Sequence, residues 1–217
     1  MNTNKDPQAR FWVEAKVSIA KSAVFLGCGE ADLDRGDLMS ASINAYYSLF
    51  HLSLTLMWLL PESVSQSLHK DLINVRDAGE ELPNKITSHK KAENFLRAVQ
   101  VNLPVPNLIS LYQRALTLRE FASYGPRVTY NGDQPFVGTC SFQTRNVREI
   151  VQAMPDMFVS ALRAAFPQTA YEGNLAPIVV DGAIDLLRGP EFPFKNWYSK
   201  SVLGRAEVLI NGLRNQA

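Results

Sequence analysis

Hydrophobic and polar positions recur at helical spacing along most of the chain, and the longest uncharged run lies in its first third. Residues 38–61 carry no charge between Asp37 and Glu62, and their apolar side chains point in almost every direction around a helix. This pattern is typical of a helix at the centre of a bundle. One stripe is polar, with spacings of four, three and four residues that place its members on one face. The stripe consists of Asn44, Ser48, His51 and Thr55. It is expected to line a site or to face a partner.

The same periodicity predicts further helices around the central one. The first begins at the capping pair Asp6-Pro7 and is predicted to stop at Gly27-Cys28-Gly29. The other predicted helices end at caps, glycines or prolines, and they cover about residues 64–76, 88–99, 107–124, 144–166, 177–188 and 199–213. A short hairpin or an ordered loop is expected around residues 128–137, where Asn131-Gly132 separates two apolar runs.

These elements predict an all-α fold with two parts. Residues 1–167 form a helical bundle, and residues 168–217 form a helical C-terminal extension that packs on it. Four aromatic residues in the extension are predicted to pack across the bundle as a strap, in preference to forming a binding patch. They are Phe192, Phe194, Trp197 and Tyr198.

Composition and charge narrow the classes of function. The chain has 217 residues, is 46% hydrophobic and has a net charge of +1, so no global field drives it to nucleic acid or to a membrane. Cys28 and Cys140 fit neither a metal-ligand spacing nor a redox pair, and we expect both to be reduced. The N-terminus lacks the apolar core of a signal peptide, and residues 43–60 contain too many polar side chains for a membrane span. A cytoplasmic location is predicted.

Several common chemistries have no motif in the chain. The sequence contains no GxxxxGK[ST], GxGxxG, HExxH, CxxC or GxSxG, and its three histidines lack a ligand spacing on one helix. No metal and no cofactor are therefore expected.

What remains is a set of polar side chains on apolar helices. Its members are Asn44, Ser48, His51, His89, Arg119 and Tyr124. An arginine can hold a phosphate, and a nearby histidine or tyrosine can move a proton, which suffices for metal-independent RNA cleavage by the 2′-hydroxyl. The same residues suffice for a buried hydrogen-bond network, which the residues alone favour.

The placement of the arginines sharpens this set. Arg119 falls inside the apolar arc of its helix, so we expect it to have an anionic or carbonyl partner. Arg114 points away from that arc. Arg145 and Arg148 lie in the first turns of a later helix, where they oppose the helix dipole. They serve either an external anion or, as we favour, a solvated surface.

Two segments resemble a known family. The run ASINAYYSLFHLSLTLMWLL, within residues 37–60, resembles the AxNRAYYAxFHxxxALL segment of bacterial HEPN-domain proteins, particularly small members of uncharacterised function. His89 opens a later helix as in the family, and residues 119–124 stand where the family shows RxxADY. The resemblance covers about residues 8–165.

The resemblance implies an antiparallel helical bundle, usually dimeric, with a cleft at the dimer axis. Many members of this superfamily are metal-independent endoribonucleases that act as toxins or in phage defence. Others pair with a small nucleotidyltransferase or serve as non-catalytic modules. Catalytic members carry a histidine four to six residues after the arginine, a place that Tyr124 occupies here, and Ser123 replaces the family's aspartate.

Three hypotheses follow from the residues and the resemblance. The first is a ribonuclease or toxin, with an antitoxin as its expected partner in the latter case. Arg119 would bind the phosphate, and Tyr124, His51 or His89 would handle the proton. The second is a non-catalytic module that binds RNA, a nucleotide or a partner protein. Its binding groove, and that of the ribonuclease, would include Asn44, Tyr47, Ser48, Arg145 and Arg148. The third is a structural dimeric adaptor whose two-fold interface contains Asn44, Ser48 and His51.

Overall fold

The computed structural model describes residues 7–60, 88–99, 103, 105–125, 128–131, 134–137, 144–168, 175–190 and 194–214. In this part of the chain the fold is a bundle of helices, which confirms the predicted all-α class. The helices are α1 (Pro7–Asp34), α2 (Leu38–Leu59), α4 (His89–Val99), α5 (Leu108–Tyr124), α6 (Thr144–Ala165), α7 (Leu175–Arg188), α8 (Phe194–Trp197) and α9 (Lys200–Asn211). The predicted helix over residues 64–76 lies outside the described residues.

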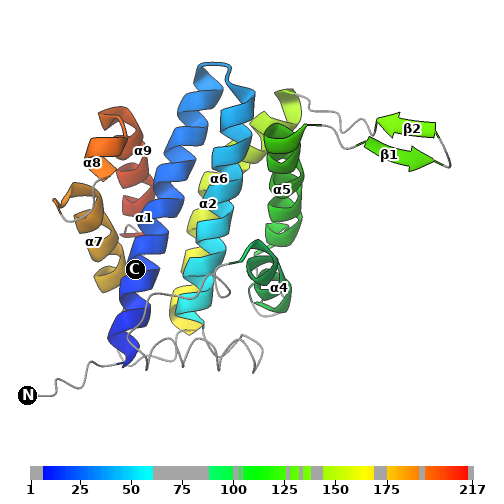
Figure 1. The fold of residues 1–217 in the computed structure, drawn as a ribbon. Helices are drawn as coiled ribbons and strands as arrows, with labels where there is room; N and C mark the ends of the chain where they lie inside the picture. The colour runs from blue at the N-terminus through cyan, green and yellow to red at the C-terminus, as the bar shows by residue number, and fades with distance from the viewer. Residues whose placement is uncertain are drawn as a thin grey trace, which may run out of the picture.

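A small hairpin interrupts the helices, as the sequence predicted. Strand β1 (Val128–Asn131) pairs antiparallel with β2 (Gln134–Val137), and Val128 lies opposite Val137. The hairpin projects beyond the end of α5 and away from the bundle (Figure 1).

Helix α2 forms the centre of the bundle, and its apolar side chains are buried over most of its length. It runs antiparallel to α1, with α4 and α5 on its other side and α6 behind it (Figure 1). Helices α7 and α9 of the C-terminal part pack on α1. Among the described helices, none combines the length and the apolar character needed to cross a membrane.

The predicted end of the first helix is wrong. Helix α1 continues through Gly27-Cys28-Gly29 as far as Asp34, and the chain turns at Gly36, whose φ of 78° is favourable only for glycine. A Cβ at Gly27 would lie 2.9 Å from the carbonyl oxygen of Val202. Gly27 therefore allows α9 to approach α1 closely and does not end the helix.

The polar stripe of α2 mostly faces α1 of the same chain. The amide of Asn44 donates to Asp32 at 2.6 Å, and the hydroxyl of Ser48 donates to the carbonyl oxygen of Ser22 at 2.8 Å. Thr55 donates to the carbonyl oxygen of His51 one turn earlier at 2.9 Å. Ser48 is buried between α1 and α2, which does not favour its predicted places in a binding groove and in a subunit interface.

The residues that precede three of the helices differ in whether they cap them. The hydroxyl of Ser88 accepts a hydrogen bond from the Lys91 amide at 3.4 Å, and that of Ser199 accepts one from Val202 at 3.4 Å. Asn107 precedes α5 but makes no side-chain capping bond, because its backbone is in the left-handed region with a φ of 67°.

The predicted aromatic strap is wrong for Trp197. Its side chain is 71% exposed, and α8 contacts α7 and α9, so this indole does not pack across the bundle. Tyr198 does pack against the edge of the core. Phe192 and the side chain of Phe194 lie outside the described part.

Candidate functional site

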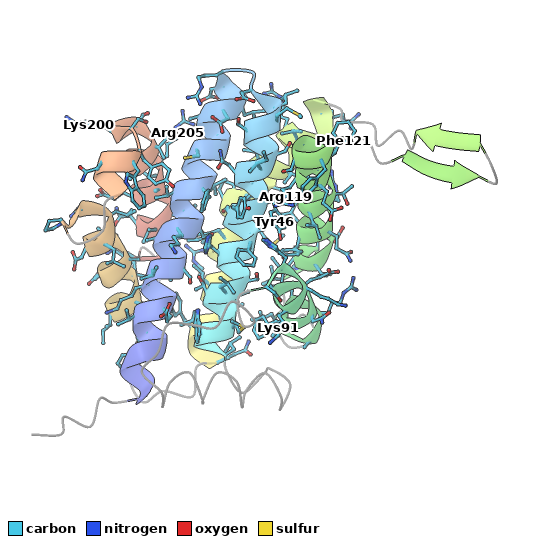
Figure 2. The ribbon with its side chains drawn as sticks, in the orientation of Figure 1. Tyr46, Lys91, Arg119, Phe121, Lys200 and Arg205 are labelled. Carbon is cyan, nitrogen blue, oxygen red and sulfur yellow. The ribbon has the colours of Figure 1, made fainter. Side chains whose placement is uncertain are left out.

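Polar aromatic side chains from three helices surround one arginine on the side of α2 that faces α4 and α5. We call this group the Arg119 cluster. It consists of Tyr46 and Tyr47 from α2, His89 from α4, and Tyr112, Arg119 and Tyr124 from α5. Figure 2 shows Tyr46 and Arg119 between α2 and α5. The structure thus brings together three of the four predicted catalytic residues and the predicted binding residue Tyr47.

Arg119 is half-buried, and phenols surround its guanidinium. The guanidinium carbon lies 5.8 Å from the ring centroid of Tyr46 and 5.3 Å from that of Tyr124, distances suited to cation–π attraction. Its Nη1 donates to the Tyr124 hydroxyl at 3.4 Å. Hydrogen bonds to Tyr47 and then to Tyr124 raise the pKa of Arg119 above its ordinary value.

The expected anionic or carbonyl partner of Arg119 is absent from the described part of the chain. Its contacts there are phenol rings and hydroxyls, and its buried Nε has no hydrogen-bond partner. A buried N–H without a partner is costly. The cluster therefore holds a permanent cation with spare donor capacity.

Beneath Arg119, two buried tyrosines connect to His89. The Tyr46 hydroxyl lies 2.5 Å from Nδ1 of His89 and 3.2 Å from the Tyr112 hydroxyl, which in turn donates to the His89 carbonyl oxygen at 3.3 Å. Burial raises the pKa of Tyr46 to about 12 and raises that of Tyr112 even further above its ordinary value. Both phenols are therefore neutral at physiological pH.

His89 is the most accessible histidine of the described residues. Its ring packs against Phe50 with centroids 4.7 Å apart, and partial burial together with the positive charge of Arg119 lowers its pKa. A neutral imidazole at physiological pH can accept a proton.

His51 has a different environment from His89. Its ring stacks on Phe25 of α1 at 5.5 Å, and its Nδ1 is buried without a hydrogen-bond partner. Burial first, and then the charges of Lys21 and His89, lower its pKa to about 3. So weak a base is poorly suited to take a proton in catalysis, so the geometry does not favour the predicted catalytic role of His51.

The other predicted binding residues lie apart from the cluster. Asn44 is committed to Asp32 between α1 and α2. Arg145 bonds to Glu149 of its own helix at 2.7 Å, and Glu149 also accepts from Arg114. Arg148 is exposed on the same helix. The structure thus supports the solvated-surface interpretation of both α6 arginines.

Sequence reasoning did not select Tyr112 for the site. Tyr112 is fully buried and lies seven residues, or about two helical turns, before Arg119 on α5. That spacing places both side chains on the same face of a helix. It is the sequence feature that could have identified Tyr112 as a neighbour of Arg119.

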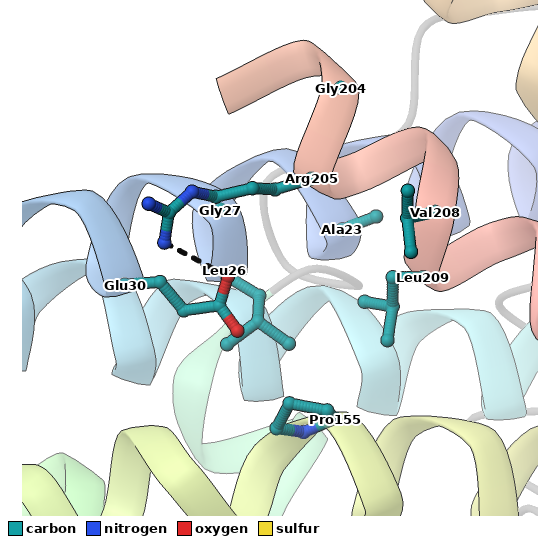
Figure 3. A pocket seen from close by; sticks show the side chains of 9 residues that line it. All are labelled: Ala23, Leu26, Gly27, Glu30, Pro155, Gly204, Arg205, Val208 and Leu209. Carbon is teal, nitrogen blue, oxygen red and sulfur yellow. Dashed lines mark ion pairs between the residues drawn. The ribbon is translucent and has the colours of Figure 1, made fainter. Parts of the chain in front are cut away.

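Away from the Arg119 cluster, a hollow lies between α1, α6 and α9 (Figure 3). Its volume is about 390 Å³, and its lining is mainly apolar, with Arg205 and Glu30 forming an ion pair at 3.6 Å. Arg205 also bonds to Asp34 at 2.7 Å. The charged side chains that line this hollow are therefore paired within the chain, unlike Arg119. Among the described residues, no three His, Cys, Asp or Glu side chains gather into a group that could hold a metal ion.

Comparisons with known proteins leave the chain without an assigned family. No protein-family model matches it, and no curated protein or solved structure matches it. The relation to HEPN proteins that its motifs indicate stays a prediction, and the function has to be inferred from the chemistry of the Arg119 cluster.

Proposed function

We propose that this protein acts on RNA as a HEPN-like, metal-independent endoribonuclease of the toxin or phage-defence type, with Arg119 binding the scissile phosphate. The observation that carries the proposal is the state of Arg119, which is half-buried, lies against phenol rings and has an unpartnered Nε. A phosphate oxygen would supply the missing acceptor, and charge-assisted bonds from arginine to phosphate are strong and often bidentate.

The surrounding phenols suit the same ligand. Tyr47 and Tyr124 hydrogen-bond the guanidinium and limit its orientations. A phenol hydroxyl can also donate a hydrogen bond to a phosphate oxygen. Tyr124 is 69% exposed, so it lies where a strand could reach it from solvent. The arrangement is one cation with several hydroxyl donors, which suits an anionic ligand such as a phosphodiester and does not suit a metal ion.

The test compares two arginines of one helix. Purified protein is incubated with a labelled single-stranded RNA in the presence of EDTA, and Arg119→Ala is expected to lower the cleavage rate on the order of 10²-fold or more. Arg114→Ala is the matched control, because Arg114 is exposed on α5 and bonds to Glu149. A folded wild-type protein that leaves RNA intact, or equal cleavage by both variants, would contradict the proposal.

A second candidate is a non-catalytic HEPN-like module that binds RNA, a nucleotide or a partner such as a small nucleotidyltransferase. The observation that favours it is Tyr124, which stands where catalytic HEPN members carry a histidine. In this case fluorescence anisotropy would show Arg119-dependent binding of a labelled oligonucleotide without turnover. With one phosphate contact, the logarithm of the binding constant should fall with that of the salt concentration at a slope of about −0.7.

Both candidates include a homodimer, as the HEPN resemblance implies. Light scattering coupled to size-exclusion chromatography would measure the mass in solution. A mass of one chain, 24.2 kDa, would argue against this part of the proposal.

A further inference from the structure

The ring of Tyr124 forms the exposed end of the Arg119 cluster. Tyr124 is the last residue of α5, and Gly125 ends the helix with a φ of 72°. Its side chain is 69% exposed, whereas Tyr46 and Tyr112 of the same cluster are fully buried. Single exposed aromatic rings are common on protein surfaces. What distinguishes Tyr124 is the contact that holds its ring.

That contact is made by Arg119. The guanidinium carbon lies over the Tyr124 ring, 5.3 Å from its centroid, and Nη1 donates to the hydroxyl at 3.4 Å. The same guanidinium lies over the buried ring of Tyr46 at 5.8 Å. Arg119 therefore connects a fixed ring in the core to a ring at the surface. Because one guanidinium covers only one face of a ring, and the side chain is 69% exposed, the other face of Tyr124 is open to solvent.

An open aromatic face beside a cation matches the two parts of a nucleotide. Every nucleobase has a flat π-face that stacks on aromatic side chains, and the sugar joins it to a phosphate. Arginine binds phosphate through charge-assisted hydrogen bonds. The ring centre of Tyr124 and the guanidinium carbon of Arg119 lie 5.3 Å apart, so a single nucleotide can contact both.

We propose that Tyr124 is a stacking platform for an unpaired nucleobase whose adjoining phosphate binds to Arg119. This inference rests on the proposed action on RNA, and it states which form of RNA the site accepts. The form is a single strand, because the bases of a duplex stack on one another and present no free face. Stacking does not depend on the identity of the base, so the site accepts single strands of any sequence. Arg119 holds the ring before binding, which lowers the entropy lost when a base stacks on it.

Binding measures the contribution of the ring without any cleavage. The probe is a fluorescently labelled 2′-O-methyl oligonucleotide of about eight residues, which has bases and phosphates but no 2′-hydroxyl to attack phosphorus. In a fluorescence anisotropy titration, Tyr124→Ala should weaken its binding by about 5- to 150-fold, the usual effect of losing one stacked base. Tyr124→Phe keeps the ring and should retain most of the wild-type affinity.

Trp197→Ala is the matched control for the loss of an exposed ring. Trp197 is 71% exposed, much like Tyr124, but it belongs to α8, which lies across the bundle from α5 (Figure 1). Its removal should leave the affinity unchanged. Both positions are exposed, so we expect both variants to keep the helical circular dichroism spectrum of the wild type.

A strand without bases separates stacking from phosphate binding. It has the same length and the same phosphates, but its sugars carry no base. Tyr124→Ala should bind this abasic strand as the wild type does, whereas Arg119→Ala should bind both strands more weakly. In NMR spectra of the full chain, the ring protons of Tyr124 should move upfield when the strand with bases is added, because a stacked base shields them. The abasic strand should cause no such shift.

The outcomes distinguish this inference from the function on which it rests. Equal losses in Tyr124→Ala and Tyr124→Phe, or an equal loss of Tyr124→Ala binding to the abasic strand, would assign the effect to the hydroxyl and overturn the stacking. An affinity that falls in Arg119→Ala but not in Tyr124→Ala, or that falls equally in Trp197→Ala, would also overturn it and leave the proposed function standing. A wild-type protein that binds neither strand overturns both. Base-dependent binding by a protein that leaves a 2′-hydroxyl strand intact refutes the ribonuclease and supports the stacking platform.

Discussion

The buried imidazole of His51 should make the stability of this protein depend on pH. Its ring centroid lies 5.5 Å from that of Phe25 and 5.4 Å from that of Phe50, and its Nδ1 has no hydrogen-bond partner. Burial, reinforced by the charges of Lys21 and His89, lowers its pKa to about 3. An unfolded chain would have a histidine pKa near about 6.5. The unfolded state therefore binds this proton at a higher pH than the native state does.

The sign and size of the effect follow from proton linkage. Because the unfolded state binds more protons between the two pKa values, the free energy of unfolding falls as the pH drops below about 6.5. Between pH 7 and pH 5 the unfolded histidine becomes protonated while the native one stays neutral, which costs about 2 kcal/mol. The free energy of unfolding stops falling near the native pKa of about 3, where the total loss from His51 reaches about 5 kcal/mol. The total free energy of unfolding of a globular domain is about 5–15 kcal/mol, so this loss would be a large part of it.

The assay is urea unfolding at several pH values between 7 and 5. His51→Phe is the comparison variant, because it keeps an aromatic ring against Phe25 and Phe50 and has nothing to titrate. The wild type should lose about 2 kcal/mol more than His51→Phe over this range. Comparing the two proteins at each pH removes the contributions of other groups. Equal losses in the wild type and the variant would refute the reasoning about His51.

Two further predictions concern the packing of α1. Gly27→Ala should destabilise the fold by about 1–3 kcal/mol, because the new Cβ would lie 2.9 Å from the Val202 carbonyl oxygen. The comparison variant is Gly204→Ala, whose Cβ meets nothing within 4 Å. It should stabilise α9 by up to about 1 kcal/mol, since alanine favours the helix. Thermal unfolding measures both, and a Gly27→Ala protein as stable as wild type would contradict the close contact. Ser48→Ala should cost about 1 kcal/mol in urea unfolding, since it removes the 2.8 Å bond to the Ser22 carbonyl oxygen; no change would mean that this bond is absent in solution.

The sequence predicted the helices well and the role of one glycine pair poorly. Hydrophobic periodicity located α2, α5, α6, α7 and α9 because each buries a continuous apolar face. Glycine, however, has two uses that a sequence does not separate: it ends helices, and it lets helices approach. Gly36 ends α1 with a positive φ, whereas Gly27 allows contact with α9, which comes from the far end of the chain.

The candidate site was only partly predictable. The helical wheel placed Arg119 on the buried face of α5, and its half-buried position agrees. The wheel does not identify the partner across the interface, because Tyr46 and His89 are 43 residues apart and meet only when α4 packs on α2. The polar stripe of α2 was a clear signal in the sequence, but periodicity cannot say which neighbouring helix covers it.

Hydrogen-bond satisfaction separates the two polar faces of α2 where sequence polarity does not. On the α1 side, Asn44 and Ser48 have partners within the chain, whereas the Nδ1 of His51 has none and is buried beside the ring of Phe25. On the α5 side, Arg119 keeps a buried Nε without an acceptor. A buried donor left without an acceptor costs stability unless something binds to it. Because Arg119 also carries a permanent charge, we propose the α5 side of α2 as the face that binds a ligand.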